Sequence, residues 1–278
     1  MIVNQNELIN TIKKLGVAPL KQHGQHFLID QKVVTELVRS ADLSQNDDVL
    51  EVGPGLGTLT EKLVQKAKRL VACEIDKKLF LFLKKSFSSQ KNLTLLHGDI
   101  RKINLADYFP NSNYVVVSNI PYSLTSYLLK MFLASPAPPR KMALLVQKEI
   151  AERITARPPD MSLLSLSVQL FCEPKIVRVI PPTAFYPEPE VSSAILILVA
   201  RSNPLIKKVE QEIFFRLAKI SFAGKRKQIH NSLKNGLRLS SNQISQLLKN
   251  SAIDESRRPQ TLTWSEWQNL TTNYSKLS

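Results

Sequence analysis

Between residues 30 and 200, short apolar runs alternate with longer stretches in which apolar residues recur every three or four positions. Short runs of this kind are typical of buried strands, and the longer stretches are typical of helices that cover a sheet. The alternation predicts an α/β fold in which parallel strands are joined by crossover helices. Seven strands are predicted, at residues 48–52, 69–75, 93–98, 114–119, 142–147, 166–171 and 193–199.

Helices and loops complete this first region. Residues 58–67 and 77–87 have the apolar spacing of covering helices. The proline-rich stretches 135–140 and 181–190 are predicted loops, because proline lacks the N–H that a helix interior or a strand ladder needs. We expect residues 1–200, including an N-terminal arm, to form one α/β domain.

After residue 201 the pattern becomes helical. Gly236 is the expected end of one helix, and Ser240 or Ser241 is the expected start of the next. The sequence therefore predicts a small, all-helical second domain over residues 201–278. Its three predicted helices are residues 210–222, 225–236 and 240–250.

The charge distribution favours a polyanionic partner. The chain of 278 residues carries a formal charge of +15, and after residue 200 there are 14 Lys and Arg against 5 Asp and Glu. Such a block suits the phosphates of a nucleic acid, although a solubilising surface is the simpler explanation for scattered lysines. We expect no membrane contact, because no apolar run reaches the length of a span and no basic helix has a strong aromatic face.

Other compositional features narrow the class of protein. The start of the chain has neither the basic residues nor the apolar stretch of a signal peptide, so we expect a cytoplasmic protein. Cys73 and Cys172 lie far apart and match no metal or redox spacing. We therefore expect no metal site. We also expect the protein to act as a monomer.

Three glycines follow the first predicted strand directly. Gly53, Gly55 and Gly57 let backbone approach a ligand closely, although a tight turn alone would also explain them. The dinucleotide fingerprint needs glycine where Thr58 stands, and the carboxyl group of Glu51 would serve a pyrophosphate poorly. The spacing therefore favours a ligand that lacks phosphate and carries a positive charge.

Polar side chains end the next three predicted strands. Glu74 closes the second strand, Asp99 follows the third and Asn119 ends the fourth. Open parallel sheets bind ligands at this carboxyl edge. We infer an adenosine-containing cofactor, with the glycines under its amino-acid end, Glu74 on the ribose and Asp99 accepting from the adenine amino group. S-adenosylmethionine meets each requirement.

The stretch "SNIPY" contains no acid or base. Methyl transfer from a sulfonium needs mainly a positioned lone pair, so the side-chain oxygen of Asn119 and the carbonyl of Ile120 are predicted to orient an amine of the target base. Tyr122 offers a face on which a flipped base can stack, with Phe185 or Tyr186 on its other side. In isolation, Asn119 as a helix cap and Tyr122 as a core residue would be the simpler interpretation.

The chain resembles the small-subunit rRNA adenine dimethyltransferase family over residues 21–260. The motifs occur in the order seen in that family: "GQHFL", "EVGPGLGTLT", "EID", "GD", "SNIPY", "QKEIAERI", "FYPEPEVSSA" and "KRKQIHNSL". The resemblance implies a Rossmann-like methyltransferase domain, a helical C-terminal domain, and dimethylation at N6 of two adjacent adenosines in the 3'-terminal hairpin of small-subunit rRNA.

The same resemblance implies the residues of the site. Tyr122 and Phe185 would hold the target adenine. The expected S-adenosylmethionine contacts are His26, Leu28, Gly53, Gly55, Glu74, Asp99 and Asn119. The chain departs from the family at His26, where asparagine is usual, and at residues 155–167, which lack the family's glycine and tyrosine.

A basic cluster lies in the predicted second domain. Lys225, Arg226 and Lys227 precede His230 and Asn231 on a predicted helix, and we expect contacts to rRNA phosphates there. A solvated surface would explain the cluster equally simply. Two other functions stay open, a large-subunit rRNA adenine methyltransferase of the macrolide-resistance type and a noncatalytic RNA-binding assembly factor.

Overall fold

The computed structural model describes residues 5–16, 26–111, 113–224 and 226–277. The chain divides into two compact units. One comprises the chain up to residue 151 together with residues 174–200. The other comprises residues 152–173 and 201–278, so a segment that interrupts the α/β unit in sequence belongs to the helical unit.

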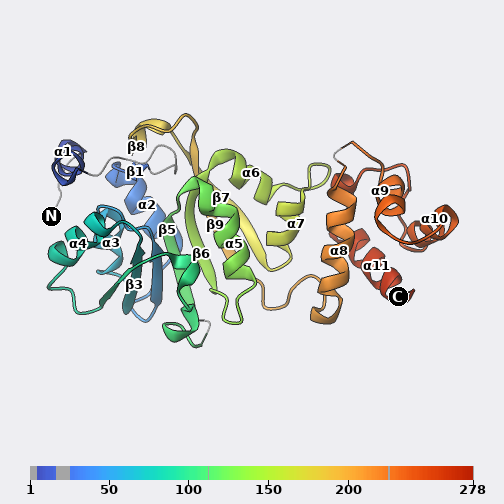
Figure 1. Ribbon diagram of the computed structural model, residues 1–278, viewed down its shortest axis with the longest axis horizontal. Coiled ribbons are helices and arrows are strands. Elements are labelled where there is room, and N and C mark those ends of the chain that lie inside the picture. The colour runs from blue at the N-terminus through green and yellow to red at the C-terminus, as the bar shows by residue number, and fades with distance from the viewer. Residues whose placement is uncertain (1–4, 17–25, 112, 225, 278) are drawn as a thin grey trace. The chain divides into compact units, whose positions relative to one another are not determined.

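The first unit is built on a seven-stranded sheet of order β4-β3-β2-β5-β6-β9-β7, which confirms the predicted α/β class (Figure 1). Its strands are β2 (Asp48–Val52), β3 (Arg69–Glu74), β4 (Leu93–His97), β5 (Tyr114–Asn119), β6 (Lys141–Gln147), β7 (Cys172–Ile180) and β9 (Ser193–Ala200). The first five strands pair in parallel, whereas β9 is antiparallel to β6. The sheet is therefore mixed, not wholly parallel as the sequence had indicated.

One predicted strand is wrong. Residues 166–171 lie mostly in helix α7 (Leu163–Gln169), which begins at a capping box between Ser162 and Ser165. Alternating apolar and polar residues in "LSVQLF" imitate the period of a strand. The strand is β7 instead, which the sequence conceals because it is an edge strand with most of its side chains exposed or half-buried and a proline at position 174.

Helices cover both faces of the sheet. The helices are α2 (Gln31–Ala41), α3 (Thr58–Leu63), α4 (Lys77–Ser86), α5 (Thr125–Leu133) and α6 (Lys148–Thr155). Crossovers between parallel strands are right-handed, so connections that run in opposite directions along a sheet lie on opposite faces. The β2–β3–β4 connections run one way and the β5–β6 connection runs the other, which places α3 and α4 opposite α5. All strand residues of β5 before Asn119 are buried, as expected for a strand covered on both faces.

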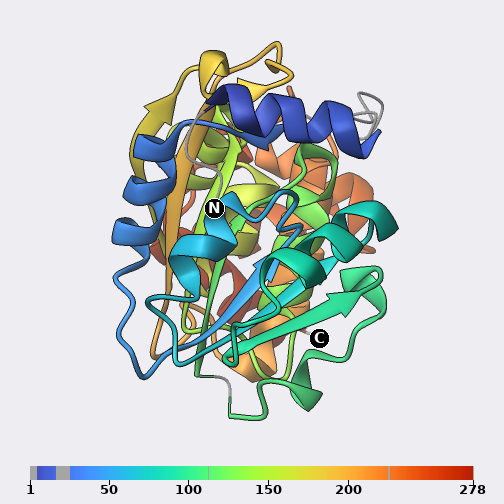
Figure 2. The same ribbon diagram turned by 90° about the vertical axis from the view of Figure 1, so that its left-hand side faces the viewer.

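Three short elements gather at one end of the sheet. Helix α1 (Gln5–Leu15) packs Leu8 and Ile12 into a cluster with residues of β1 (Phe27–Leu28) and β8 (Phe185–Tyr186). Strands β1 and β8 pair with each other as a separate two-stranded sheet. Figures 1 and 2 both show α1 and β8 at the same end of the strands. Helix α1 and strands β1 and β8 therefore cover this end of the sheet.

The second unit is helical around its own core. Helix α10 starts at the predicted Ser240, whose side chain forms a capping box with Gln243. Trp267 is fully buried at the centre of the core. The helices after residue 201 are α8 (Gln211–Phe222), α9 (Ile229–Gly236), α10 (Ser241–Asn250) and α11 (Trp264–Ser275), of which α11 was not predicted. None of the described helices combines the length and the apolar character that crossing a bilayer requires.

Candidate active site

A cavity of about 560 Å³ lies in the first unit, between the carboxyl ends of β2, β3 and β5 and the residues of β1. A pocket of this size is typical of small-molecule and cofactor sites. Its lining brings together most of the residues that the sequence singled out. The lining residues are His26, Phe27, Leu28, Glu51, Gly53, Pro54, Gly55, Leu56, Thr58, Leu59, Glu74, Ile75, Asp76, Arg101, Asn119, Ile120, Pro121, Tyr122, Ser123 and Leu124.

The glycine-rich loop after β2 forms the floor of the cavity. Gly55 has φ +59° and Gly57 has φ +79°, a backbone region that favours glycine. A Cβ atom on Gly57 would stand 2.6 Å from the ring of Phe87, and one on Gly55 would stand 3.2 Å from the ring of Phe27. The backbone conformation therefore favours glycine at both positions, and at Gly57 the neighbouring ring of Phe87 also leaves no space for a Cβ atom.

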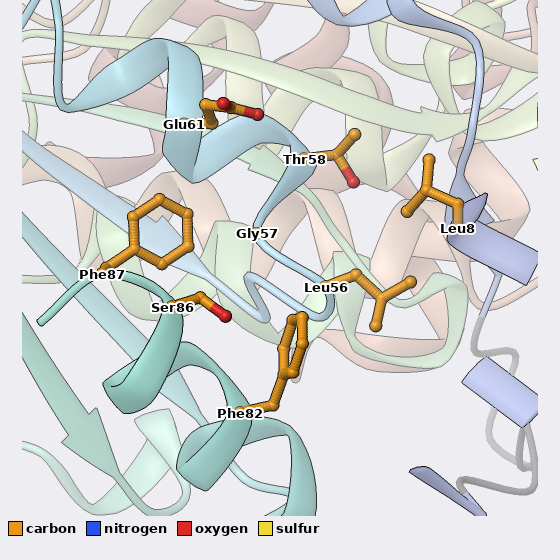
Figure 3. A pocket seen from close by; sticks show the side chains of 8 residues that line it. All are labelled: Leu8, Leu56, Gly57, Thr58, Glu61, Phe82, Ser86 and Phe87. Carbon is orange, nitrogen blue, oxygen red and sulfur yellow. The ribbon is translucent and has the colours of Figure 1, made fainter. Parts of the chain in front are cut away.

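The other side of this loop is packed against α1 and α4. Figure 3 shows Leu8 of α1 facing Thr58, and Phe82 of α4 facing Leu56, around a second cavity of about 30 Å³. That volume is close to the share of one water molecule in the liquid. The loop therefore lies between the larger cavity on one side and the side chains of α1 and α4 on the other, where only a small space remains.

Two buried carboxyl groups lie beside the loop. Glu74, 2% exposed, accepts hydrogen bonds from the backbone N–H of Gly55 at 3.0 Å and of Asp76 at 2.9 Å. Glu51, 1% exposed, accepts one from the hydroxyl of Thr60 at 2.7 Å. Burial raises the pKa of both groups, and it raises that of Glu51 to about 8. A positively charged ligand group would favour the ionised form of Glu51.

Asp99 follows β4 and begins a short 3₁₀ turn over Ile100–Lys102. Its carboxylate is held by Arg101, whose Nε lies 2.9 Å from each oxygen and whose Nη2 lies 2.6 Å from Oδ2. This pairing keeps the pKa of Asp99 below its usual value. Arg101, which the sequence did not single out, lines the cavity.

The end of β5 fixes the orientation of the Asn119 amide. Its Nδ2 donates to the backbone carbonyl of His26 at 3.0 Å. The amide oxygen is therefore the atom that remains to accept a hydrogen bond in the cavity. Ile120 and Pro121 line the cavity beside it.

Tyr122 and His26 place two rings next to each other. Their centroids are 5.4 Å apart and their planes are tilted by 31°. The hydroxyl of Tyr122 lies 2.6 Å from the hydroxyl of Ser193, and Nδ1 of His26 donates to the carbonyl of Pro187 at 2.7 Å. A carbonyl only accepts, so Nδ1 carries the proton. These bonds connect the "SNIPY" turn, the N-terminal arm and the "FYPEPEVSSA" segment around one cavity.

The structure does not bring Phe185 into the cavity. Its ring is 1% exposed and packs in the hydrophobic core under the sheet. Its strand partner Leu28 does line the cavity, and the neighbouring Tyr186 packs on the cluster that contains α1. The aromatic rings that line the cavity are those of His26, Phe27 and Tyr122, whereas Phe185 anchors β8 in the core.

The basic cluster lies in the second unit. Arg226 and Lys227 are exposed, and they lie in the turn between α8 and α9 and not on a helix as the sequence had indicated. Lys225 falls outside the described residues. His230, on α9, lies 3.2 Å from the hydroxyl of Ser241 through its Nε2. Across the described parts of the chain, His, Cys, Asp and Glu side chains form no group of three that could hold a metal ion.

A model of the ribosomal RNA adenine dimethylase family matches residues 20–270 of the chain. The chain belongs to this family. A relative in Dehalococcoides mccartyi (strain BAV1), named "Ribosomal RNA small subunit methyltransferase A", is 42% identical over 253 residues, which are 91% of this chain and 87% of the relative. A relative of the same name in Alkaliphilus oremlandii is 36% identical over 263 residues, 92% of each protein.

Solved structures agree with this assignment. A dimethyladenosine transferase from Plasmodium falciparum superposes with a TM-score of 0.79 at 25% identity and covers 90% of this dimethylase and 98% of its own chain. The 23S rRNA methyltransferase ErmE superposes with a TM-score of 0.74 at 25% identity, and the superposition covers 90% of this chain and 99% of the ErmE chain. The protein is therefore an S-adenosylmethionine-dependent rRNA adenine dimethylase with a Rossmann-like fold, as the sequence predicted.

The cavity of the dimethylase fits this cofactor. The buried carboxyl of Glu51 suits a positive charge, the glycine loop leaves backbone open to the amino-acid end, and Glu74 retains free lone pairs for ribose hydroxyls. Ile75 is 64% exposed although it is apolar, and it lines the cavity next to Glu74. An exposed apolar side chain at this place offers a surface for the adenine ring.

Sequence reasoning missed four contributors to the site: Ile75, Arg101, Pro187 and Ser193. Ile75 directly follows Glu74, so its position after a strand was the available signal. Pro187 and Ser193 act on His26 and Tyr122 from more than 70 residues away, and no local pattern reveals such contacts.

Proposed function

We propose that this enzyme dimethylates N6 of two adjacent adenosines in the 3'-terminal hairpin of small-subunit rRNA. The observation that carries the proposal is the hydrogen bond from Asn119 Nδ2 to the carbonyl of His26, which leaves the amide oxygen of this cavity-lining residue to accept from a ligand. Relatives that share up to 42% of their residues with this chain are named as small-subunit rRNA methyltransferases.

The chemistry needs positioning more than proton transfer. The cofactor supplies a methyl group on a positively charged sulfur, which is already a strong electrophile. The oxygen of Asn119 and the carbonyl of Ile120 accept the two N–H groups of the adenine amine, so its lone pair turns toward the methyl group. In methyl transfer the new N–C bond would form as the cofactor's C–S bond broke, and the amine would release its proton to water. No side-chain base is required, which explains the composition of "SNIPY".

We assign most of the remaining residues by their places in the cavity; Asp99 does not line it, and its assignment rests on its partner Arg101, which does. The flipped adenine stacks on Tyr122, whose ring is fixed by Ser193 and flanked by His26. Leu28, Gly53 and Gly55 border the cofactor, together with His26 and Asn119. Glu74 binds the ribose and Asp99 the adenine amino group of the cofactor. Phe185 supports this arrangement from the core.

The partner is the small ribosomal subunit or its precursor, met in the cytoplasm by a monomeric enzyme. Arg226 and Lys227 contact rRNA phosphates, and Lys225 belongs to the same basic stretch. Phosphate contacts position the hairpin, whereas its shape and unpaired adenines provide selectivity.

The test compares substrates. Purified enzyme is incubated with labelled cofactor and either small or large ribosomal subunits from cells that lack the corresponding methyl groups. We expect label only in the small-subunit RNA, in two adjacent dimethyladenosines that mass analysis locates. Label confined to large-subunit RNA would favour the activity of the ErmE-like neighbour, with which this chain shares 25% identity. RNA binding without any label would favour a noncatalytic assembly factor.

A further inference from the structure

Arg101 holds the carboxylate that the proposed function assigns to the cofactor's adenine. Its backbone N–H donates to Asp99 Oδ1 at 3.0 Å, and its guanidinium makes three further contacts with the two oxygens at 2.6 to 2.9 Å. Arg101 engages both oxygens through three N–H groups, because its single Nε–H is shared between Oδ1 and Oδ2. An adenine amino group that approaches Asp99 therefore competes with the guanidinium for the same carboxylate.

The guanidinium is the part that can leave. The backbone hydrogen bond from Arg101 to Asp99 begins the 3₁₀ turn and is fixed by the chain. The Arg101 side chain is 47% exposed and the Asp99 side chain only 15% exposed. An exposed ion pair of this kind stabilises a structure only slightly, so a bound ligand can replace it at small cost.

Arg101 shares its cavity with the turn that would hold the target base. It lines the same cavity as Tyr122, Ser123 and Leu124, which belong to the turn that holds the target adenine under the proposed function. Tyr127 of α5, which is 48% exposed, lies near Arg101. A guanidinium released from Asp99 would remain beside this turn, where the proposed function places the flipped nucleotide.

We propose that Arg101 couples the two substrates: it pairs with Asp99 in the free enzyme, and when adenosine occupies the cavity it is released to bind an rRNA phosphate beside the flipped base. Arg101 is thus a positioning residue that makes cofactor and RNA bind cooperatively. The coupling is reciprocal, because each ligand must favour the other's binding by the same factor. This inference rests on the proposed assignment of Asp99 to adenine.

The test measures RNA affinity against salt concentration, with and without S-adenosylhomocysteine. The probe is the 3'-terminal hairpin RNA, and the variants are Arg101→Leu and, as matched control, Lys102→Met. Lys102 is the exposed neighbouring cation; its charge also lowers the pKa of Asp99, but the described hydrogen bonds to that carboxylate come from Arg101. Each phosphate contact contributes about 0.7 to the slope of log affinity against log salt on single-stranded nucleic acid.

For the native enzyme and Lys102→Met we expect S-adenosylhomocysteine to steepen the slope by about 0.7 and to tighten RNA binding, because one phosphate contact is added. For Arg101→Leu we expect the same slope in both conditions. Without RNA, Arg101→Leu should bind S-adenosylhomocysteine about twofold to fivefold more tightly than the native enzyme, because no fork competes for Asp99.

The outcomes separate this inference from the function on which it rests. The coupling is wrong if S-adenosylhomocysteine leaves the salt slope of the native enzyme unchanged, or if it steepens the slope of Arg101→Leu as much as that of the native enzyme. In either case the proposed dimethylase activity would still stand, because the enzyme would still bind the cofactor. Failure of every form to bind S-adenosylhomocysteine, or unweakened binding by Asp99→Ala, would overturn the adenine assignment and the coupling with it.

Discussion

Single residues in this site act through contacts that fix their orientation. Asn119 was visible in the sequence as a polar residue at a strand end, but the sequence did not show which of its two amide atoms would face the ligand. The carbonyl of His26 decides this by taking the amide N–H. The same holds for Tyr122, whose ring is fixed by Ser193. Residue type and strand position were therefore predictable, whereas orientation depended on tertiary contacts.

Glu51 gives a prediction about stability and pH. Its pKa is about 8 in the folded protein against 4.5 as the ordinary value, so the native state retains a proton that the unfolded state releases. The stabilising effect of that proton is complete below pH 4.5 and is lost as the pH rises to about 8. We expect the free energy of unfolding of the native protein to fall over this range relative to Glu51→Gln. Urea titrations at several pH values measure it, and a constant difference between the two proteins would contradict the assigned burial.

At the scale of elements, most predicted strands are marked by burial. Strands β2, β3, β5, β6 and β9 were predicted nearly to their ends because mostly buried runs of apolar residues mark them. Strand β4 was predicted to within one residue although none of its residues is fully buried, because its leucines still form an apolar run. Strand β7 was missed because an edge strand exposes most of its side chains, and α7 was mistaken for a strand because its polar residues alternate with apolar ones. The pairing of β1 with β8 joins residues more than 150 positions apart, so local patterns did not reveal it.

Helix α1 should support cofactor binding through the glycine loop. Leu8 is 1% exposed and packs against Leu56, so Leu8→Ala should lower the free energy of unfolding by about 2–4 kcal/mol and loosen the loop. We expect weaker binding of S-adenosylhomocysteine, measured by calorimetry.

The matched control for Leu8 is Leu247→Ala, which removes an equally buried leucine from α10 in the second unit. It should lower stability similarly and leave cofactor affinity unchanged. Equal affinities for both variants would show that α1 contributes to stability alone.

At the scale of the whole molecule, the proposed function divides between the two units. The cavity and the "SNIPY" turn lie in the first unit, and Arg226 and Lys227 lie in the second. The formal charge of +15 is concentrated toward the second unit in sequence. The α/β class and the helical C-terminal unit were predictable from composition and motifs, whereas the transfer of residues 152–173 to the helical unit was not. The RNA-binding role of the second unit stays a prediction.

Reversing the charges of Arg226 and Lys227 to Glu should weaken RNA binding and flatten its salt dependence by about 0.7 to 0.9 per lost phosphate contact. The control is binding of S-adenosylhomocysteine, which should not change because its cavity lies in the first unit. Filter binding at several salt concentrations measures the slope. A slope equal to that of the native enzyme would mean that this turn is only a solvated surface.

The central claim is that the Asn119 oxygen orients the adenine amine for attack, and Asn119→Ala tests it most directly. The measurement is the single-turnover rate of methyl transfer to undermethylated small subunits, at saturating cofactor and with cofactor and RNA affinities determined separately. We predict a loss of at least about a hundredfold in rate while RNA affinity stays near normal, because a misplaced nucleophile loses its alignment. Methyl transfer at the native rate by Asn119→Ala would contradict the account.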